Sequence, residues 1–131
     1  MVRFILDFGP RTHIGSAELD RTGFLCTADR AKQLMLNHMF NVFNSLAPSY
    51  LCEEFQRVNH SHYTRHAQHN FIVPRTKGIA KYNFSVVGVK AWNKLPLSIK
   101  CIQNKTAFKQ ATKIFLKNRA SVMEQEVFVY Y

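Results

Sequence analysis

The stretch TADRAKQLMLNHMFNVFNSL, residues 27–46, decides the predicted fold because it has the pattern of one long amphipathic helix. Thr27 can cap its N-terminus, and Asp29 suits the positive end of the helix dipole. At about 100° per residue, the polar residues gather on one narrow face and apolar residues cover most of the rest. A helix this widely apolar needs partners on two sides. Its predicted core residues are Leu34, Met35, Met39, Val42 and Leu46.

A second long helix is predicted near the end of the chain, with a cap at Asn104 or Thr106 and an end near Arg119. Its apolar side supplies two more predicted core residues, Phe108 and Phe115. Lysines recur at every fourth position on another side of this helix. They face either solvent or phosphate, because exposed lysines are common on helix surfaces. The row consists of Lys105, Lys109, Lys113 and Lys117.

Shorter elements are expected between the two helices. A short helix can follow Pro48 and cover residues 49–55. Two β-branched and aromatic runs, residues 71–73 and 84–87, are predicted to pair as an antiparallel ribbon. One or two helical turns then carry Trp92 and Leu95, the last predicted core residues. The predicted fold class is therefore mainly α (α+β): a small helical domain with a short two-stranded antiparallel β-ribbon.

The first 25 residues have a different pattern. Residues 2–8 are predicted to be the last turns of a helix that is stopped by Gly9 and Pro10. Ser16 can cap a short helix over residues 17–21, and Gly23 can end it. Because a helix of one or two turns is marginal in water, its apolar positions need a packing surface.

The charge distribution predicts a polyanionic partner. Of the 131 residues, 18 are Lys or Arg and 8 are Asp or Glu, which gives a formal net charge of +10. No acidic residue occurs between Phe55 and Met123. Such a field repels itself unless RNA, DNA or anionic lipid neutralises it, although a basic surface without a specific partner is the alternative. The predicted phosphate contacts are Arg65, Arg75, Lys77, Lys81, Lys105, Lys109, Lys113 and Lys117.

The sequence predicts no catalytic, metal or cofactor site. A two-metal polymerase site needs clustered carboxylates. The three aspartates are scattered, and Glu53 and Glu54 would point about 100° apart on a helix. Four histidines fall within ten residues, but no carboxylate lies near to orient their rings, so a phosphate-binding loop or a plain loop is favoured over a metal site. These histidines are His60, His62, His66 and His69.

Cysteine usage and hydropathy limit the cellular compartments in which this chain is expected. Cys26, Cys52 and Cys101 are far apart, so they support neither a disulfide framework nor a zinc knuckle. The apolar run at residues 4–6 is too short for a signal peptide, and no segment approaches the ~20 apolar residues that cross a bilayer. We therefore expect an intracellular protein, nuclear or cytoplasmic, that is not secreted and has no membrane partner.

Several runs of the sequence, in order, resemble the tail that follows the polymerase domain in non-LTR (LINE-type, jockey-like and chicken-repeat-like) retrotransposon reverse transcriptases. Residues 84–96, FSVVGVKAWNKLP, are the most specific and are similar to F-S-x-x-G-x-x-x-W-N-x-L-P. Residues 44–51, NSLAPSYL, are similar to N-x-L-A-P-x-Y-L, and residues 71–75, FIVPR, to F-x-V-P-R. Residues 2–14 look like the end of the thumb helix, and weaker similarities fall at 23–30, 62–65 and 108–109.

The resemblance implies a non-catalytic C-terminal fragment of an RNA-directed DNA polymerase, since the chain keeps none of the family's palm motifs. It implies a nucleic-acid-binding or thumb-packing support region, whose partners are an RNA or DNA backbone and the upstream polymerase or thumb. The predicted divisions are a thumb-helix end and connector (1–25), a post-polymerase helical domain (26–119) and a tail (120–131). An inert structural remnant and a host-adopted basic nucleic-acid-binding module are the alternatives.

Overall fold

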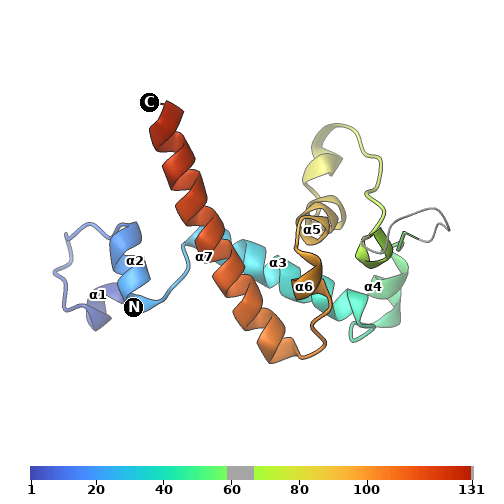
Figure 1. Cartoon of the computed structure of the whole chain (residues 1–131), viewed down its shortest axis with the longest axis horizontal. Helices are drawn as coiled ribbons and strands as arrows, with labels where there is room; N and C mark the ends of the chain where they lie inside the picture. Colours follow the sequence, from blue (N-terminus) through green and yellow to red (C-terminus); the bar gives the residue numbers. More distant parts are fainter. Residues whose placement is uncertain (59–66, 131) are drawn as a thin grey trace.

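The computed structural model describes the backbone of residues 1–58 and 67–130, and the side chains of these residues except 67 and 120–130. This part of the chain is mainly helical, which confirms the α prediction (Figure 1). The helices, with η marking a 3₁₀ helix, are α1 (Val2–Ile5), α2 (Ser16–Thr22), α3 (Thr27–Phe43), α4 (Ser49–Glu53), η1 (Ala67–His69), η2 (Gly78–Tyr82), α5 (Phe84–Asn93), α6 (Leu97–Lys100) and α7 (Lys105–Tyr130).

Helix α3 is the centre of the fold, and both α5 and α7 pack on it (Figure 1). On the α7 side, Phe40 stacks on Phe108 with ring centroids 4.5 Å apart. On the α5 side, Gly88 allows a close approach, because a Cβ at this position would lie 3.2 Å from the Met39 Sδ atom. The two partners that the apolar pattern of α3 requires are therefore supplied by this chain.

An aromatic core forms where these three helices meet. Trp92 of α5 is fully buried, and its ring centroid lies 5.1 Å from that of Phe43, 6.1 Å from that of Phe71 and 5.8 Å from that of Phe108. Large aromatic side chains contribute the most burial per residue in a small core. Trp92 is therefore the side chain that joins α3, α5 and α7 in one core.

The predicted two-stranded ribbon is wrong for the described residues. Residues 84–87 form the first turn of α5, and Phe71 makes only an isolated antiparallel bridge with Arg57. The helix is favoured because Val86, Val89 and Trp92 recur at three-residue spacing, and burial of all three on one side stabilises it. A short β-branched run cannot by itself distinguish a strand from a buried helix.

Two predicted core residues, Leu34 and Leu46, are exposed, at 46% and 64% of their surface. The buried arc of α3 includes Gln33, Leu36 and Phe40, and Leu34 points about 180° away from the middle of that arc. Leu46 lies beyond the end of α3, so it leaves the helical stripe. Of the other predicted core residues, Met39, Val42, Trp92, Leu95 and Phe108 are buried, and Met35 and Phe115 are half-buried.

The helix boundaries agree in part with the predicted caps. Gly23 ends α2 with φ +73°, as predicted, whereas Gly15 and not Ser16 precedes its first turn. The Glu18 carboxylate accepts a hydrogen bond from the Gly15 N–H at 2.8 Å. Hydrogen bonds from its own backbone N–H and from Gly15 hold the pKa of Glu18 below its ordinary value.

The long helices also differ from prediction at their ends. Helix α3 has Cys26 at its N-cap position, one residue before the predicted Thr27. Of the two predicted caps for α7, Asn104 is confirmed, since its Oδ1 atom accepts a hydrogen bond from the Thr106 N–H at 2.9 Å. Helix α7 continues to Tyr130, past the predicted end near Arg119. None of the helices in the described residues combines the length and apolar character that crossing a bilayer requires.

Candidate nucleic-acid interface

Helix α7 is docked on α3 along one side. Phe108, Thr112 and Leu116, four residues apart, are buried in this contact. The buried Thr112 hydroxyl donates to a backbone carbonyl of its own helix, that of Phe108 at 2.9 Å. The Gln33 side chain of α3 donates to the Lys109 carbonyl of α7 at 3.0 Å. These contacts fix the rotation of α7 about its axis, and this rotation decides which of its side chains reach solvent.

The rotation leaves three lysines of α7 in solvent. Lys105, Lys109 and Lys113 are exposed, and we call them the α7 row; Lys117, one turn further, is half-buried. Like charges four residues apart repel by a few tenths of a kcal/mol per pair, so the row does not stabilise the helix. Three cations in line on a rigid helix can instead contact successive phosphates of one nucleic-acid strand.

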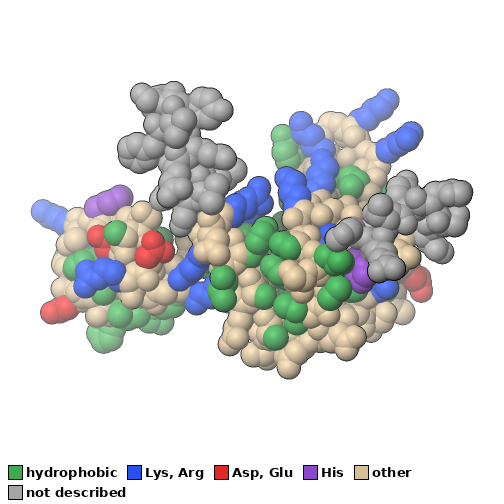
Figure 2. Space-filling view, viewed as in Figure 1, with side chains coloured by type: hydrophobic (Ala, Val, Ile, Leu, Met, Phe, Trp, Pro, Cys, Tyr) green, Lys and Arg blue, Asp and Glu red, His purple; other side chains and the backbone are tan. Residues whose placement is uncertain are grey.

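A second basic surface lies around η2. Arg75, Lys77 and Lys81 are exposed, and the Lys81 ammonium is 4.9 Å from the centroid of the Tyr82 ring. In Figure 1 this segment lies on the far side of α5 from α7, and Figure 2 shows Lys and Arg side chains both near α7 and near the end of α5. The structure therefore divides the predicted phosphate contacts between two separate surfaces.

Two further exposed lysines, on the helix that η2 contacts, were left out of the predicted site. Lys90 of α5 and Lys94, its C-cap residue, are both exposed and lie four residues apart. The sequence carries this signal, because lysines at i and i+4 share a helix face. The helical turns predicted to carry Trp92 and Leu95 also include these two lysines, but the predicted phosphate contacts left them out.

The predicted Arg65 and the histidines His60, His62 and His66 lie outside the described residues. The fourth histidine, His69, ends η1, and its ring stacks on Phe43 with centroids 5.9 Å apart. Among the described residues, no group of three or more His, Cys, Asp or Glu side chains is placed to hold a metal ion.

Two cations of the acid-free stretch have structural roles. Lys100 is 5% exposed, and its Nζ atom donates to the Asn70 side chain at 2.6 Å and to the Asn93 carbonyl at 3.1 Å. Burial lowers the pKa of Lys100 below its ordinary value. The Arg57 guanidinium lies 4.4 Å from the centroid of the Phe43 ring and donates to the Phe43 carbonyl. Burial keeps Lys100 away from a phosphate ligand, whereas Arg57 is exposed.

The stretch 84–96, which carries the most specific resemblance, is used for packing. The Trp92 Nε1–H donates to the His69 carbonyl at 2.9 Å. The Asn93 side chain accepts from the Phe71 N–H and donates to the Phe71 carbonyl, both at 3.0 Å. The Asn93 side chain thus satisfies the backbone N–H and carbonyl of Phe71, as a neighbouring strand would. Trp92, with no exposed surface, serves as a core anchor rather than a base-stacking platform.

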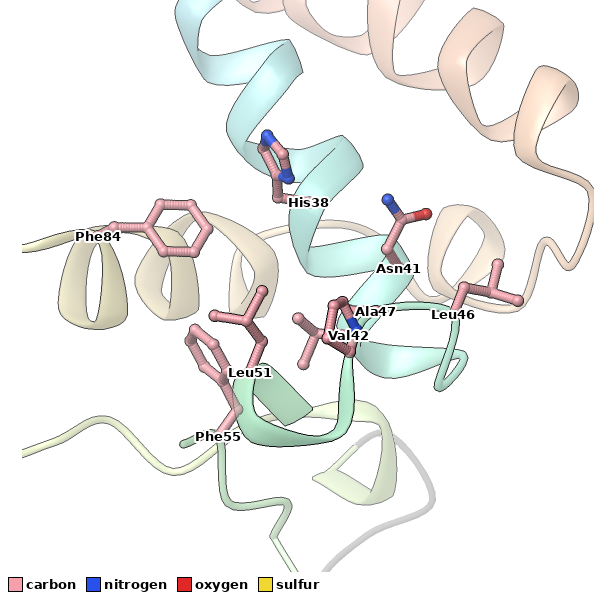
Figure 3. Close-up of a pocket in the computed structure, with 9 residues that line it drawn as sticks. His38, Asn41, Val42, Leu46, Ala47, Leu51, Phe55 and Phe84 are labelled. Atoms are coloured by element: carbon pink, nitrogen blue, oxygen red, sulfur yellow. The ribbon is translucent and has the colours of Figure 1, made fainter. Parts of the chain in front are cut away.

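An apolar groove opens between α3, α4 and the start of α5 (Figure 3). Its volume is about 480 Å³, and Figure 3 shows Leu51, Phe55 and Phe84 converging on it from two different elements. The Asn41 Oδ1 atom at this groove is buried and lacks a hydrogen-bond partner among the described residues. The lining residues are His38, Asn41, Val42, Leu46, Ala47, Pro48, Leu51, Phe55 and Phe84.

No protein-family model, curated protein or solved structure matches this chain. The retrotransposon relationship therefore stays a prediction from the ordered sequence motifs.

Proposed function

We propose that this chain is a non-catalytic nucleic-acid-binding module of the kind that follows the polymerase domain in LINE-type reverse transcriptases. It binds the sugar–phosphate backbone of RNA or DNA and carries out no chemistry itself. Phosphate contacts from lysines supply affinity without sequence preference, because every nucleotide presents the same charge.

The α7 row carries this proposal. Its three exposed lysines sit on a helix that the buried Phe108, Thr112 and Leu116 hold against α3, so their spacing is fixed before any ligand arrives. A pre-ordered row loses less side-chain and backbone entropy on binding than lysines on a loose tail would. The formal net charge of +10 favours encounter with any polyanion.

The first test is the salt dependence of binding. Affinity of the whole chain for a fluorescent single-stranded RNA and for a DNA duplex is measured by anisotropy between 50 and 200 mM salt. We expect a steep linear fall of log K with log salt, by about 0.7–0.9 per neutralised phosphate. No binding at low salt, or binding that salt does not weaken, would contradict the proposal.

The second test separates the α7 row from net charge. The triple variant Lys105→Gln, Lys109→Gln and Lys113→Gln is compared with Arg11→Gln, Arg21→Gln and Lys32→Gln, which removes three exposed charges outside both basic surfaces. The first set should lower the salt slope by about 2–3 and the control set by much less. Equal losses would show that only total charge matters.

A second candidate function is packing against a protein partner, the thumb of the parent polymerase in the resemblance. The apolar groove with the exposed Leu51 and Phe84 at its edge supports it, since an apolar surface of a partner could be buried there. Co-expression with a LINE-type polymerase domain then gives a stable complex that Leu51→Lys abolishes. A chain that stays monomeric beside that domain, yet binds RNA, would leave only the first function.

A further inference from the structure

We propose that Cys101 is a modification site: the thiol of this chain that exchanges fastest with small disulfides, with His69 as its activating neighbour. The exposed Sγ atom of Cys101 lies 3.9 Å from the Nε2 atom of His69. The two residues are 32 apart in sequence, so the fold brings them together. Cys101 is the C-cap of α6, and His69 ends η1.

The other nitrogen of His69 decides what the imidazole offers the sulfur. Nδ1 is buried and has no hydrogen-bond partner among the described residues. A buried N–H without an acceptor costs more than a buried nitrogen lone pair, which favours the tautomer with its hydrogen on Nε2. Nε2 is the nitrogen that faces Cys101 Sγ. In this tautomer a hydrogen-bond donor lies beside the sulfur that would attack a disulfide.

His69 is held in place by contacts that do not involve the cysteine. Its ring stacks on Phe43, and its carbonyl accepts the Trp92 indole N–H at 2.9 Å. The next residue, Asn70, accepts a hydrogen bond from the ammonium of Lys100, which directly precedes Cys101. The imidazole is therefore fixed in position relative to the sulfur by the core.

The chain contains two contrasting thiols as internal controls. Cys26 is also exposed, but its Sγ atom lies 3.2 Å from the Asp29 carboxylate, and a negative neighbour opposes a thiolate. Cys52 is half-buried, and its thiol donates to the Ala47 carbonyl at 3.5 Å. Exposure alone would predict equal reactivity for Cys26 and Cys101. The neighbouring side chains predict that Cys101 reacts faster.

The oxidant in the proposed reaction is glutathione disulfide. The Cys101 thiol loses its proton to solvent, and the thiolate attacks one sulfur of glutathione disulfide. The disulfide bond of glutathione breaks as a new one forms between Cys101 and one glutathione. The second glutathione leaves as a thiolate and takes a proton from solvent. Cys101 is oxidised and one glutathione is reduced.

The test is a timed reaction of the reduced whole chain with glutathione disulfide, with each cysteine-containing peptide followed by mass spectrometry. We expect Cys101 to react about tenfold faster than Cys26, with Cys52 slowest. Neutral iodoacetamide should give the same order, which excludes attraction of anionic glutathione as the cause. A Cys26 rate equal to or above that of Cys101 would overturn the proposal.

Two further measurements isolate His69. The variant His69→Phe keeps a ring to stack on Phe43 and removes both nitrogens, so the Cys101 rate should fall to about that of Cys26; His13→Phe, at an exposed histidine, should leave it unchanged. In 6 M urea the native chain should lose the difference between the three rates. If Cys101 still reacts fastest in urea, or in the folded His69→Phe variant, its reactivity comes from the local sequence. Either result would refute the role of His69.

Discussion

Residues 1–25 and the body built on α3 both carry dense apolar residues, but only the body buries them. Helices α1 and α2 have no buried residue, and Phe4 of α1 is 88% exposed. In the body, Trp92, Phe40 and Phe108 lose all contact with solvent. The difference lies in geometry, because α3, α5 and α7 present apolar sides that converge on one point, whereas α1 is too short to present a continuous side.

This contrast indicates where the stability of the chain resides. Hydrophobic burial is the main favourable term in folding, so the body should unfold as one cooperative unit and residues 1–25 should respond locally. Substitutions in the body should therefore change global stability, and substitutions in residues 1–25 should not.

The largest effect is expected from Trp92→Ala. Removing the indole leaves a cavity among Phe43, Phe71 and Phe108, and the free energy of unfolding should fall by about 3–5 kcal/mol. The matched change Phe4→Ala in α1 should stay within about 0.5 kcal/mol. Urea unfolding followed by far-UV circular dichroism measures both. Similar losses at the two sites would abolish the distinction between the regions.

A smaller effect is expected from Lys100→Met, which tests the polar network at the edge of the body. The Asn70 side chain and the Asn93 carbonyl would each lose a donor, so the free energy of unfolding should fall by about 1–3 kcal/mol. Lys94→Met, at an exposed lysine, is the control and should change it little. A neutral result at Lys100 would mean that the network does not hold residues 69–71 on the body.

The contribution of Lys100 to the free energy of unfolding should depend on pH with a defined sign. Burial lowers the folded-state pKa of Lys100 below the unfolded value of 10.5. Between those two values the unfolded chain binds more protons, so this lysine adds stability as pH rises. The unfolding free energy of the native chain minus that of Lys100→Met should therefore increase toward pH 10.5. A difference that shrinks over this range would contradict the assignment.

Gly23→Ala should act only within residues 1–25. Gly23 has φ +73°, where a Cβ is disfavoured by about 1 kcal/mol. The Phe24 amide, which donates to the Leu19 carbonyl at 3.1 Å, should exchange its hydrogen about fivefold faster. The unfolding midpoint in urea should stay the same, and Gly9→Ala is the control. A shifted global midpoint would show that residues 1–25 are part of the cooperative unit.

The smallest effect concerns acid. Because its hydrogen bonds lower the folded-state pKa of Glu18, its stabilisation of α2 is present above the unfolded-state pKa. It is lost as the pH falls through the lower, folded-state value. The Gly15 amide chemical shift should follow that titration, with a midpoint below 4.5, and Glu18→Gln should remove it. A midpoint at or above 4.5 would rule out the Gly15 hydrogen bond.

Periodicity was sufficient to predict α3 and the existence of α7, although not the end of α7. Residue chemistry predicted the Gly23 stop and gave Asn104 as one of two candidate caps. Periodicity failed at residues 84–87, where a β-branched run was assigned to a strand. The helical spacing of Val86, Val89 and Trp92 was present in the sequence, but only contact with α3 makes it decisive. Core prediction failed at Leu34 for a related reason, since the sequence does not specify which apolar arc of a two-sided helix meets its partners.

The candidate interface divides in the same way. The α7 row could be predicted from the sequence because four-residue spacing keeps lysines on one side of a helix. The sequence could not assign Lys100 or Arg57 to structural roles, nor separate the η2 surface from α7. Those distinctions depend on how the helices pack, since packing encloses Lys100 and places the exposed Arg57 against the Phe43 ring.

The sequence by itself determined the helical character of this chain, its lysine row and its excess positive charge, because these follow from local spacing and composition. Tertiary structure alone decided that Asn93 clamps Phe71, that Lys100 is buried and that His69 meets Cys101. Each of these joins residues from separate elements, so it exists only after α3 has brought α5 and α7 together around Trp92. Local pattern fixes what each segment can be, and long-range packing selects which side chains meet.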